Sequence, residues 1–281
     1  MLKLSKKKIN LLITGGSGFL GKSILKKIDT NKFNITLISR KKIKGFKCLI
    51  VRDIFDLSIK YYLKILKKNQ IILHLAWFTK PGHYFNSLEN FHCLDGSIRL
   101  ATACKIKKVK RFIGIGTCLE YANKNNNNNK KFNTKDRTMP NSIYTGSKIS
   151  FYNYCKDLFD KSKINFLWCR LFYLYGTGEP KEKLFSYVLS RISKNKLAKL
   201  SMAAQIKDFI NVDEASNQII KIINNDNYSG VLNICSGVGM SVREFITKLA
   251  KSINKEKFLR FNKKKLNSVD PSFVVGIKSI K

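Results

Sequence analysis

The sequence has few prolines, few acidic residues and no long hydrophobic segment. Only four of its 281 residues are proline. No apolar run approaches the roughly 18 residues that a membrane-spanning helix needs. Hydrophobic residues still make up 44% of the chain, enough to bury one large core or two small ones. A collagen-like fibre and wholesale disorder are excluded, and we expect a soluble protein with no membrane partner and no signal peptide.

Disulfide and metal-binding patterns are also missing. The seven cysteines are odd in number and widely spaced, without a C-x-x-C pair, and the chain has only three histidines. Structural zinc sites need Cys or His at close spacings, and a Ser-His-Asp triad needs partners that this pattern does not supply. We therefore predict reduced thiols, no metal and a cytoplasmic location.

The shortage of acidic residues gives the chain a high positive charge. Its 18 acidic residues stand against 54 basic ones, for a formal net charge of +36. Such a charge suits nucleic acids, but only nine of the basic residues are Arg, which base and phosphate recognition favours. The lysines run through nearly every segment, and residues 125–129 are all Asn, as a biased genomic base composition would produce. We interpret the charge as a solvated Lys-rich surface and expect no nucleic-acid partner.

Short β-branched runs alternate with amphipathic Lys-rich stretches through residues 1–170. The runs include INLLIT, NITLIS, IILHLAW, RFIGIGT and INFLWCRLF. This alternation predicts an α/β fold, a Rossmann-type doubly wound parallel sheet that binds a dinucleotide. The polar stretch 121–142 predicts a loop. After Gly176 the pattern breaks, so residues 171–281 predict a smaller mixed α/β substrate-binding lobe, partly interleaved with the first domain.

The strand INLLIT runs directly into a glycine-rich turn and then a helix pattern. Its glycines at 15, 18 and 21 would bring backbone N–H groups and a helix N-terminus close to a pyrophosphate. A plain glycine turn in another α/β protein would look similar. We predict a dinucleotide site that includes Gly15, Gly16, Ser17, Gly18, Phe19, Leu20 and Gly21.

Arg40 follows the predicted strand NITLIS, where this fold contacts the adenosine ribose. An acidic residue there would bind the 2′-hydroxyl of NAD, whereas Arg accommodates the 2′-phosphate of NADP. The sequence therefore favours NADP(H) as cofactor. NAD(H) stays the alternative, because basic residues are common throughout this chain.

Tyr144 and Lys148 stand four residues apart at the start of a predicted helix. One helical turn places both side chains on the same face. A neighbouring ammonium favours the phenolate, so such a Tyr can exchange a proton with a substrate hydroxyl or carbonyl. Y-x-x-x-K also occurs by chance. The pair indicates a catalytic site only because it follows the predicted strands of the sheet.

With these motifs together, the sequence resembles the extended short-chain dehydrogenase/reductase superfamily, specifically the NAD(P)-dependent epimerase/dehydratase family that acts on nucleotide sugars. The family's T-G-x-x-G-x-x-G matches TGGSGFLG at 14–21, and its Y-x-x-x-K matches YTGSK at 144–148. Its Ser/Thr placed before a Tyr falls on Thr117 in GTCLEY. Further matches are RLFYLYGTGEP, KDFINVDE and NICSG, and the cofactor-binding positions Asp53, Ile54, Leu75 and Ala76.

The resemblance implies a catalytic site made by Thr117, Tyr144 and Lys148. Tyr144 would be the acid/base, Lys148 would hold the nicotinamide ribose and lower the pKa of Tyr144, and Thr117 would orient the sugar oxygen. A hydride would move between the nicotinamide and a sugar carbon, normally C4. The family also implies a nucleotide-diphosphate sugar as partner, a homodimer formed through two long helices, and a role in polysaccharide precursor synthesis.

Departures from the family's pattern reduce the number of reactions that the site can be expected to catalyse. The Asp-Glu pair of 4,6-dehydratases is replaced by Cys118 and Leu119, which disfavours dehydration. Cys118 is either a packed thiol or an acid/base. Glu120 comes one position too late, and on an extended strand it would point to the opposite face. We assign two further positions to the substrate site: Tyr173, where many members have Asn, and Lys207, which replaces a pyrophosphate-binding Arg without its bidentate fork.

Three functions remain open. Reduction of a 4-keto-6-deoxy nucleotide sugar is favoured by Arg40 and by the missing dehydratase pair. The alternative is a nucleotide-sugar 4-epimerase with tightly bound NAD, which would oxidise C4 and return the hydride to the other face. The third is a non-catalytic dinucleotide-binding or RNA-associated protein, suggested by the charge of +36 and opposed by the intact Thr117, Tyr144 and Lys148.

Overall fold

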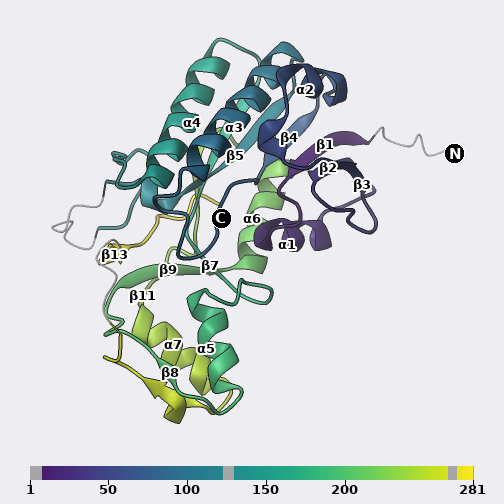
Figure 1. The fold of residues 1–281 in the computed structure, drawn as a ribbon. Helices are drawn as coiled ribbons and strands as arrows, with labels where there is room; N and C mark the ends of the chain where they lie inside the picture. The colour runs from purple at the N-terminus through teal and green to yellow at the C-terminus, as the bar shows by residue number, and fades with distance from the viewer. Residues whose placement is uncertain (1–7, 123–129, 265–270, 281) are drawn as a thin grey trace, which may run out of the picture.

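The computed structural model describes residues 8–122, 130–264 and 271–280. Figure 1 shows a larger layered part and a smaller lobe below it. The Asn run expected within the loop at 121–142 lies outside the described residues. None of the described helices combines the length and the apolar character that crossing a membrane requires.

Within the described residues, a seven-stranded parallel sheet forms the centre of the larger part. Its strand order is β10-β6-β5-β4-β1-β2-β3. The strands are β1 (Ile9–Thr14), β2 (Phe33–Ser39), β3 (Lys47–Ile50), β4 (Ile71–His74), β5 (Arg111–Thr117), β6 (Asn165–Leu171) and β10 (Gly230–Ile234). This sheet confirms the predicted Rossmann-type α/β fold, although the sequence pattern had not indicated β3.

Helices cover both faces of the sheet, which explains why its strands are continuous apolar runs. Every residue of β4 and β5 is buried. One face packs against α1 (Phe19–Lys27) and α6 (Val212–Asn224). The other packs against α2 (Ile59–Ile65), α3 (Glu89–Ile106) and α4 (Ile143–Asp160). Two hydrophobic cores therefore enclose the sheet.

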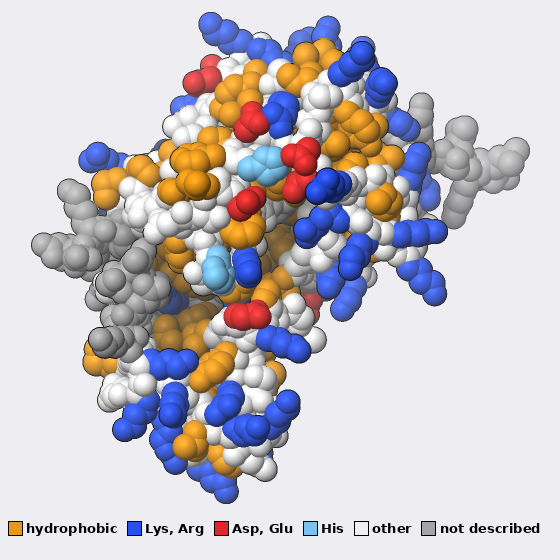
Figure 2. Space-filling view, in the orientation of Figure 1, with side chains coloured by type: hydrophobic (Ala, Val, Ile, Leu, Met, Phe, Trp, Pro, Cys, Tyr) orange, Lys and Arg blue, Asp and Glu red, His pale blue; other side chains and the backbone are white. Residues whose placement is uncertain are grey.

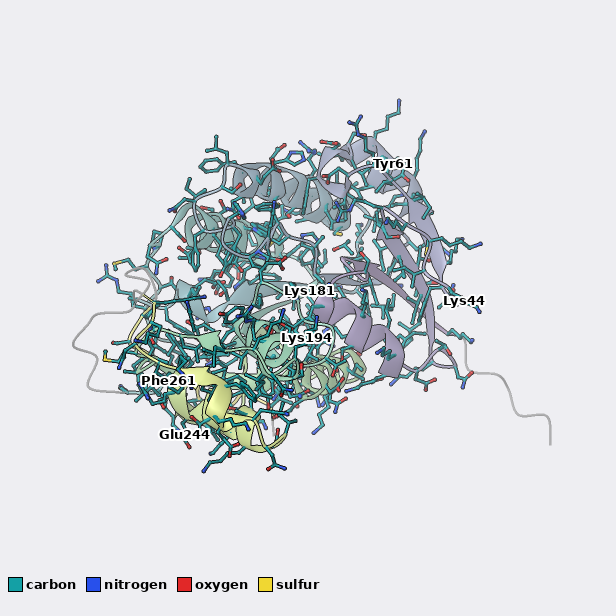
Figure 3. The ribbon with its side chains drawn as sticks, turned by 60° about the horizontal axis from the view of Figure 1, so that its bottom comes forward. Lys44, Tyr61, Lys181, Lys194, Glu244 and Phe261 are labelled. Carbon is teal, nitrogen blue, oxygen red and sulfur yellow. The ribbon has the colours of Figure 1, made fainter. Side chains whose placement is uncertain are left out.

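The smaller lobe has its own sheet and core. The sheet contains β7 (Tyr173–Tyr175), β9 (Ile206–Asn211), β11 (Gly239–Ser241) and β13 (Phe273–Val274). Helices α5 (Leu184–Ile192) and α7 (Val242–Lys251) pack with the strand pair β8 (Ala198–Lys199) and β12 (Leu259–Arg260) around the apolar core. Figure 3 looks at the molecule from this end, with the labelled Glu244 and Phe261 on the lobe and Lys44 and Tyr61 on the larger part.

The chain returns from the lobe to the larger part. After β9 it enters α6, which packs against α1, and then β10, which pairs with β6. Residues 212–234 therefore complete the larger part. They lie within the range 171–281 that the sequence analysis assigned to a lobe partly interleaved with the first domain. An amphipathic pattern shows that a helix buries one face, but not which of two cores buries it.

Candidate active site

A cavity of about 970 Å³ lies at the carboxyl ends of β1, β2, β4 and β5 and extends to the smaller lobe. Figure 2 shows the surface hollowed between the two parts, with hydrophobic side chains inside. Open parallel sheets bind ligands at this edge, because the strand order reverses there and the connecting loops leave a crevice. Both parts of the chain therefore contribute to one site.

The glycine turn between β1 and α1 forms one end of the cavity. Gly15 has a φ of +70°, and a Cβ there would lie 2.7 Å from the Ala76 nitrogen. A Cβ at Gly21 would lie 2.4 Å from the Gly15 oxygen, so α1 approaches the turn only because Gly21 has no side chain. Gly18 is the N-cap of α1, and no side chain caps this end of the helix. The first N–H groups of α1 are thus available to an anion, and the turn fits a dinucleotide pyrophosphate.

The structure brings nearly all of the predicted cofactor-binding residues to this cavity. Its lining includes Gly15, Ser17, Gly18, Phe19, Leu20, Gly21, Arg40, Asp53, Ile54, Leu75 and Ala76. Gly16 is the exception, because it is buried under α1 and a Cβ there would lie 3.3 Å from the Leu25 side chain. Arg40 is exposed directly after β2.

The three predicted catalytic residues, Thr117, Tyr144 and Lys148, all line the cavity. Tyr144 and Lys148 project from the first turns of α4. Ser142 is the N-cap of this helix, and its hydroxyl accepts a hydrogen bond from the Thr145 nitrogen at 3.2 Å. Thr117 is the last residue of β5, and its side chain lies close enough to the Tyr144 hydroxyl to lower the pKa of the phenol. All three side chains are buried. The arrangement places two hydroxyl groups and an amine side by side, facing the cavity.

Burial, and not Lys148, dominates the pKa of Tyr144. Burial raises this pKa above its usual value, the neighbouring Tyr84 and Glu120 raise it further, and the Thr117 hydrogen bond lowers it. Lys148 is not among the main causes of this shift, and its lowering of the Tyr144 pKa stays a prediction. Tyr144 carries its proton at neutral pH and can donate it.

The Lys148 side chain contacts a backbone oxygen and an aromatic ring beside the cavity. Its Nζ donates to the Ile115 oxygen at 2.7 Å and lies 3.6 Å from the centre of the Trp77 ring. Burial lowers the pKa of Lys148 to about 7, and the negative charge of Glu120 opposes this shift. The amine is therefore poised between its charged and neutral forms near neutral pH.

The two positions that would carry dehydratase carboxylates lie at the cavity wall. Cys118 and Leu119 both line it, on the 3₁₀ turn Cys118–Glu120 that follows β5. Burial raises the pKa of the Cys118 thiol, so it stays protonated. The expectation that Glu120 continues an extended strand is wrong, because the strand ends at Thr117. Glu120 instead forms a buried ion pair with Arg170.

The two predicted substrate residues lie together on the lobe side of the cavity. Tyr173 on β7 and Lys207 on β9 both line it, with the Lys207 Nζ 4.9 Å from the centre of the Tyr173 ring. Lys207 is buried, and its Nζ donates to the Pro271 oxygen at 2.5 Å. Binding of a pyrophosphate by Lys207 stays a prediction.

Several cavity residues were not found by sequence reasoning. The Lys148 Nζ lies over the Trp77 ring. Tyr84 packs edge-on against Tyr144 with ring centres 4.9 Å apart. The lobe adds an aromatic wall in which Phe209 and Phe245 stack at 4.0 Å, joined by Tyr175 and Phe185. These contacts join segments far apart in the chain, so no local pattern indicates them.

Comparison with known proteins identifies the family of this chain. The model of the NAD dependent epimerase/dehydratase family matches residues 11–235, which confirms the resemblance found in the motifs. The dTDP-6-deoxy-L-talose 4-dehydrogenase (NAD(+)) of Aggregatibacter actinomycetemcomitans is 22% identical, over 96% of this chain and 100% of its own. The CDP-abequose synthase of Salmonella typhimurium is 26% identical, over 85% of this chain and 79% of its own.

Solved structures share the fold. The UDP-N-acetylglucosamine 4-epimerase of Methanobrevibacter ruminantium, in complex with UDP-N-acetylmuramic acid, aligns with a TM-score of 0.82 at 22% identity. The alignment covers 98% of this chain and 91% of the epimerase. The likeness therefore extends over both the sheet and the lobe.

Proposed function

Because this chain belongs to the NAD dependent epimerase/dehydratase family, we propose that it reduces a 4-keto-6-deoxy nucleotide sugar. One observation carries the proposal: the buried Tyr144, whose pKa burial raises, lines the cavity together with Thr117. A phenol that keeps its proton at neutral pH is suited to donate it to a ketone oxygen. Cys118 and Leu119, in place of a carboxylate pair, count against dehydration.

In this proposal each residue has a defined task. The dinucleotide, when bound, supplies the hydride. The glycine turn and the N-terminus of α1 hold the pyrophosphate, and Lys148 holds the nicotinamide ribose. Tyr144 transfers its proton to the oxygen on C4, which becomes a hydroxyl as the carbon accepts the hydride. Thr117 then stabilises the phenolate left on Tyr144 by donating a hydrogen bond to it.

Arg40 supports NADPH as the reductant. It lies directly after β2, exposed at the edge of the cavity, where the fold places the adenosine ribose. The talose dehydrogenase relative is named for NAD(+), so NADH is the competing reductant. The nucleotide-diphosphate sugar would extend from Tyr144 toward Tyr173 and Lys207.

The test is a reduction assay with dTDP-4-keto-6-deoxyglucose and either NADPH or NADH. We expect loss of nicotinamide absorbance with the native protein, and a rate lower by about 10²–10⁴-fold in Tyr144→Phe. Dinucleotide affinity should stay within a few-fold, because the phenol is not in the glycine turn. Tyr61→Phe on α2, outside the cavity, is the matched control and should keep full activity. Full activity in Tyr144→Phe would refute the mechanism.

Epimerisation at C4 is the second candidate, because Thr117, Tyr144 and Lys148 could equally oxidise and re-reduce that carbon. The 4-epimerase of Methanobrevibacter ruminantium shares the fold over nearly the whole chain. An epimerase would retain dinucleotide through purification and would convert UDP-sugars with no net consumption of NADPH. Identification of any dinucleotide released from the purified protein separates the two reactions.

A further inference from the structure

Glu120 is a buried carboxylate beside the site that the mechanism above does not use. Its side chain is 1% exposed, and it lies behind the cavity wall. Its Oε1 accepts a hydrogen bond from the Thr117 nitrogen at 2.7 Å. Its Oε2 accepts from the Trp168 Nε1 and from the Arg170 Nε, each at 2.9 Å. Both carboxylate oxygens are therefore occupied by donors.

These contacts close the turn that follows β5. The Thr117 side-chain oxygen accepts a hydrogen bond from the Leu119 nitrogen at 3.3 Å, while the Glu120 carboxylate accepts one from the Thr117 nitrogen. This reciprocal arrangement is a capping box, and it fixes both the backbone and the side chain of Thr117. Because the Leu119 N–H uses one lone pair of the Thr117 oxygen, the hydroxyl proton is available for Tyr144.

Neighbouring strands hold Glu120 in turn. Arg170 lies on β6 beside Gly116 of β5, and its guanidinium is 4.5 Å from the centre of the Tyr121 ring. A Cβ at Gly116 would lie 2.4 Å from the Glu120 Oε1 and 2.3 Å from the Trp168 Nε1. The carboxylate and the indole thus fit only because residue 116 is glycine. The buried Glu120 carboxylate is therefore paired at both oxygens, and its neighbours hold it in place.

We propose that Glu120, held by Arg170, is a positioning residue that fixes the Thr117 hydroxyl where it can hydrogen-bond Tyr144 during the reaction. The inference rests on the proposed function, since it concerns the group that would donate the proton. Glu120 acts through Thr117 and touches neither substrate nor cofactor.

The first test removes the charge and keeps the size. In E120Q one side-chain atom becomes an N–H donor, so the amide cannot accept from Thr117, Trp168 and Arg170 together. We expect kcat to fall about 10–100-fold with KM for the keto-sugar within about 3-fold, because a misplaced catalytic group impairs the chemical step. E120Q combined with R170Q removes both charges, so it folds without an unpaired buried ion and should show the same loss.

A double-mutant cycle shows whether Glu120 acts through Thr117. The variants are T117V, E120Q and T117V/E120Q. If the inference holds, the double variant is no slower than T117V within about 2-fold, because the same interaction has already been lost. If the fold losses in kcat of the two single variants multiply in T117V/E120Q, the inference is overturned. Full kcat in E120Q/R170Q would overturn it as well, whatever the change in melting temperature. E214Q, which breaks a surface ion pair with Lys278, is the control and should keep its kcat.

A crystal structure of E120Q/R170Q supplies a readout that needs no turnover. We expect the Thr117 hydroxyl to shift away from Tyr144, and an unchanged position of Thr117 would overturn the inference. If the native protein reduces no keto-sugar, the proposed function fails, but this structure still decides the positioning role. If the native protein is active, Tyr144→Phe is inactive and E120Q is unchanged, only the positioning role fails.

Discussion

Tyr144 and Lys148 share a buried environment that acts on their charges in opposite directions. Burial raises the pKa of the phenol and lowers that of the amine to about 7. Both shifts favour the neutral form, because a charge loses its hydration when it enters the protein interior. At the scale of the residue, the site is therefore set to donate a proton.

His74 makes the stability of the fold depend on pH. Its Nδ1 lies 2.8 Å from the Thr14 hydroxyl and its Nε2 lies 2.9 Å from the Ser97 hydroxyl, and burial lowers its pKa from 6.5 to about 3. Between these values the unfolded chain binds a proton that the folded chain does not. The stabilisation is therefore complete above pH 6.5 and is lost as the pH falls toward 3, by about 1.4 kcal/mol per pH unit.

The prediction is a difference in pH dependence between two proteins. Between about pH 7.5 and about pH 5, the free energy of unfolding of the native protein should fall by about 2 kcal/mol more than that of His74→Gln. Urea unfolding at each pH measures both. Equal pH dependence in the two proteins would contradict a neutral buried His74.

Arg40 is predicted to set the choice of dinucleotide. In Arg40→Ser the 2′-phosphate of NADPH loses its charged partner, so the Kd for NADPH should rise about 10-fold while that for NADH changes less than about 2-fold. Fluorescence titration of the purified protein with each dinucleotide measures this. A parallel rise for both would mean that Arg40 does not contact the 2′-phosphate.

At the scale of the element, the glycine turn combines a left-handed backbone with close packing. We expect Gly15→Ala to destabilise the protein by about 1–3 kcal/mol more than Gly45→Ala and to weaken dinucleotide binding at least about 10-fold. Gly45 has a similar φ of +86°, but a Cβ there would meet nothing within 4 Å. Comparing the two variants therefore separates the effect of the Cβ clash from that of the left-handed backbone. Thermal unfolding and dinucleotide titration measure the two effects, and equal losses would show that the clash is unimportant.

The same elements show what the sequence could predict. The glycine turn and the Tyr144–Lys148 helix are local patterns, and the structure has both where the motifs placed them. The end of β5 is not local, because Glu120 leaves the strand to meet Trp168 and Arg170 on β6. No spacing within GTCLEY indicates partners that lie about fifty residues away in the chain. For the same reason, Trp77 under Lys148 could not be foreseen.

At the scale of the whole molecule, we propose a homodimer formed by α3 and α4. Phe91 on α3 is 54% exposed, and Leu88 just before the helix is 72% exposed. Exposed apolar side chains on a long helix suit burial against a second copy of this chain. Phe91→Glu should therefore raise the dimer Kd at least about 10-fold.

Sedimentation equilibrium measures that shift. Met202→Glu is the matched control, because Met202 is also 54% exposed but lies on the smaller lobe. It should leave the dimer intact. A native protein that is monomeric at micromolar concentration, or a Phe91→Glu protein that dimerises normally, would contradict the proposed interface.

The placement of β10 at the edge of the central sheet affects how the chain folds during synthesis. Until the ribosome has released β10, β6 has a free edge, and Arg111 lacks the carbonyl oxygens of Ile222 and Tyr228 that its guanidinium binds. Unpaired strand edges promote association between chains, and translation adds only about 5–20 residues per second. The nascent protein thus spends several seconds with an unfinished sheet. β10, the edge strand that pairs with β6, is synthesised only after much of the lobe, so a chain halted after β6 would be prone to aggregate.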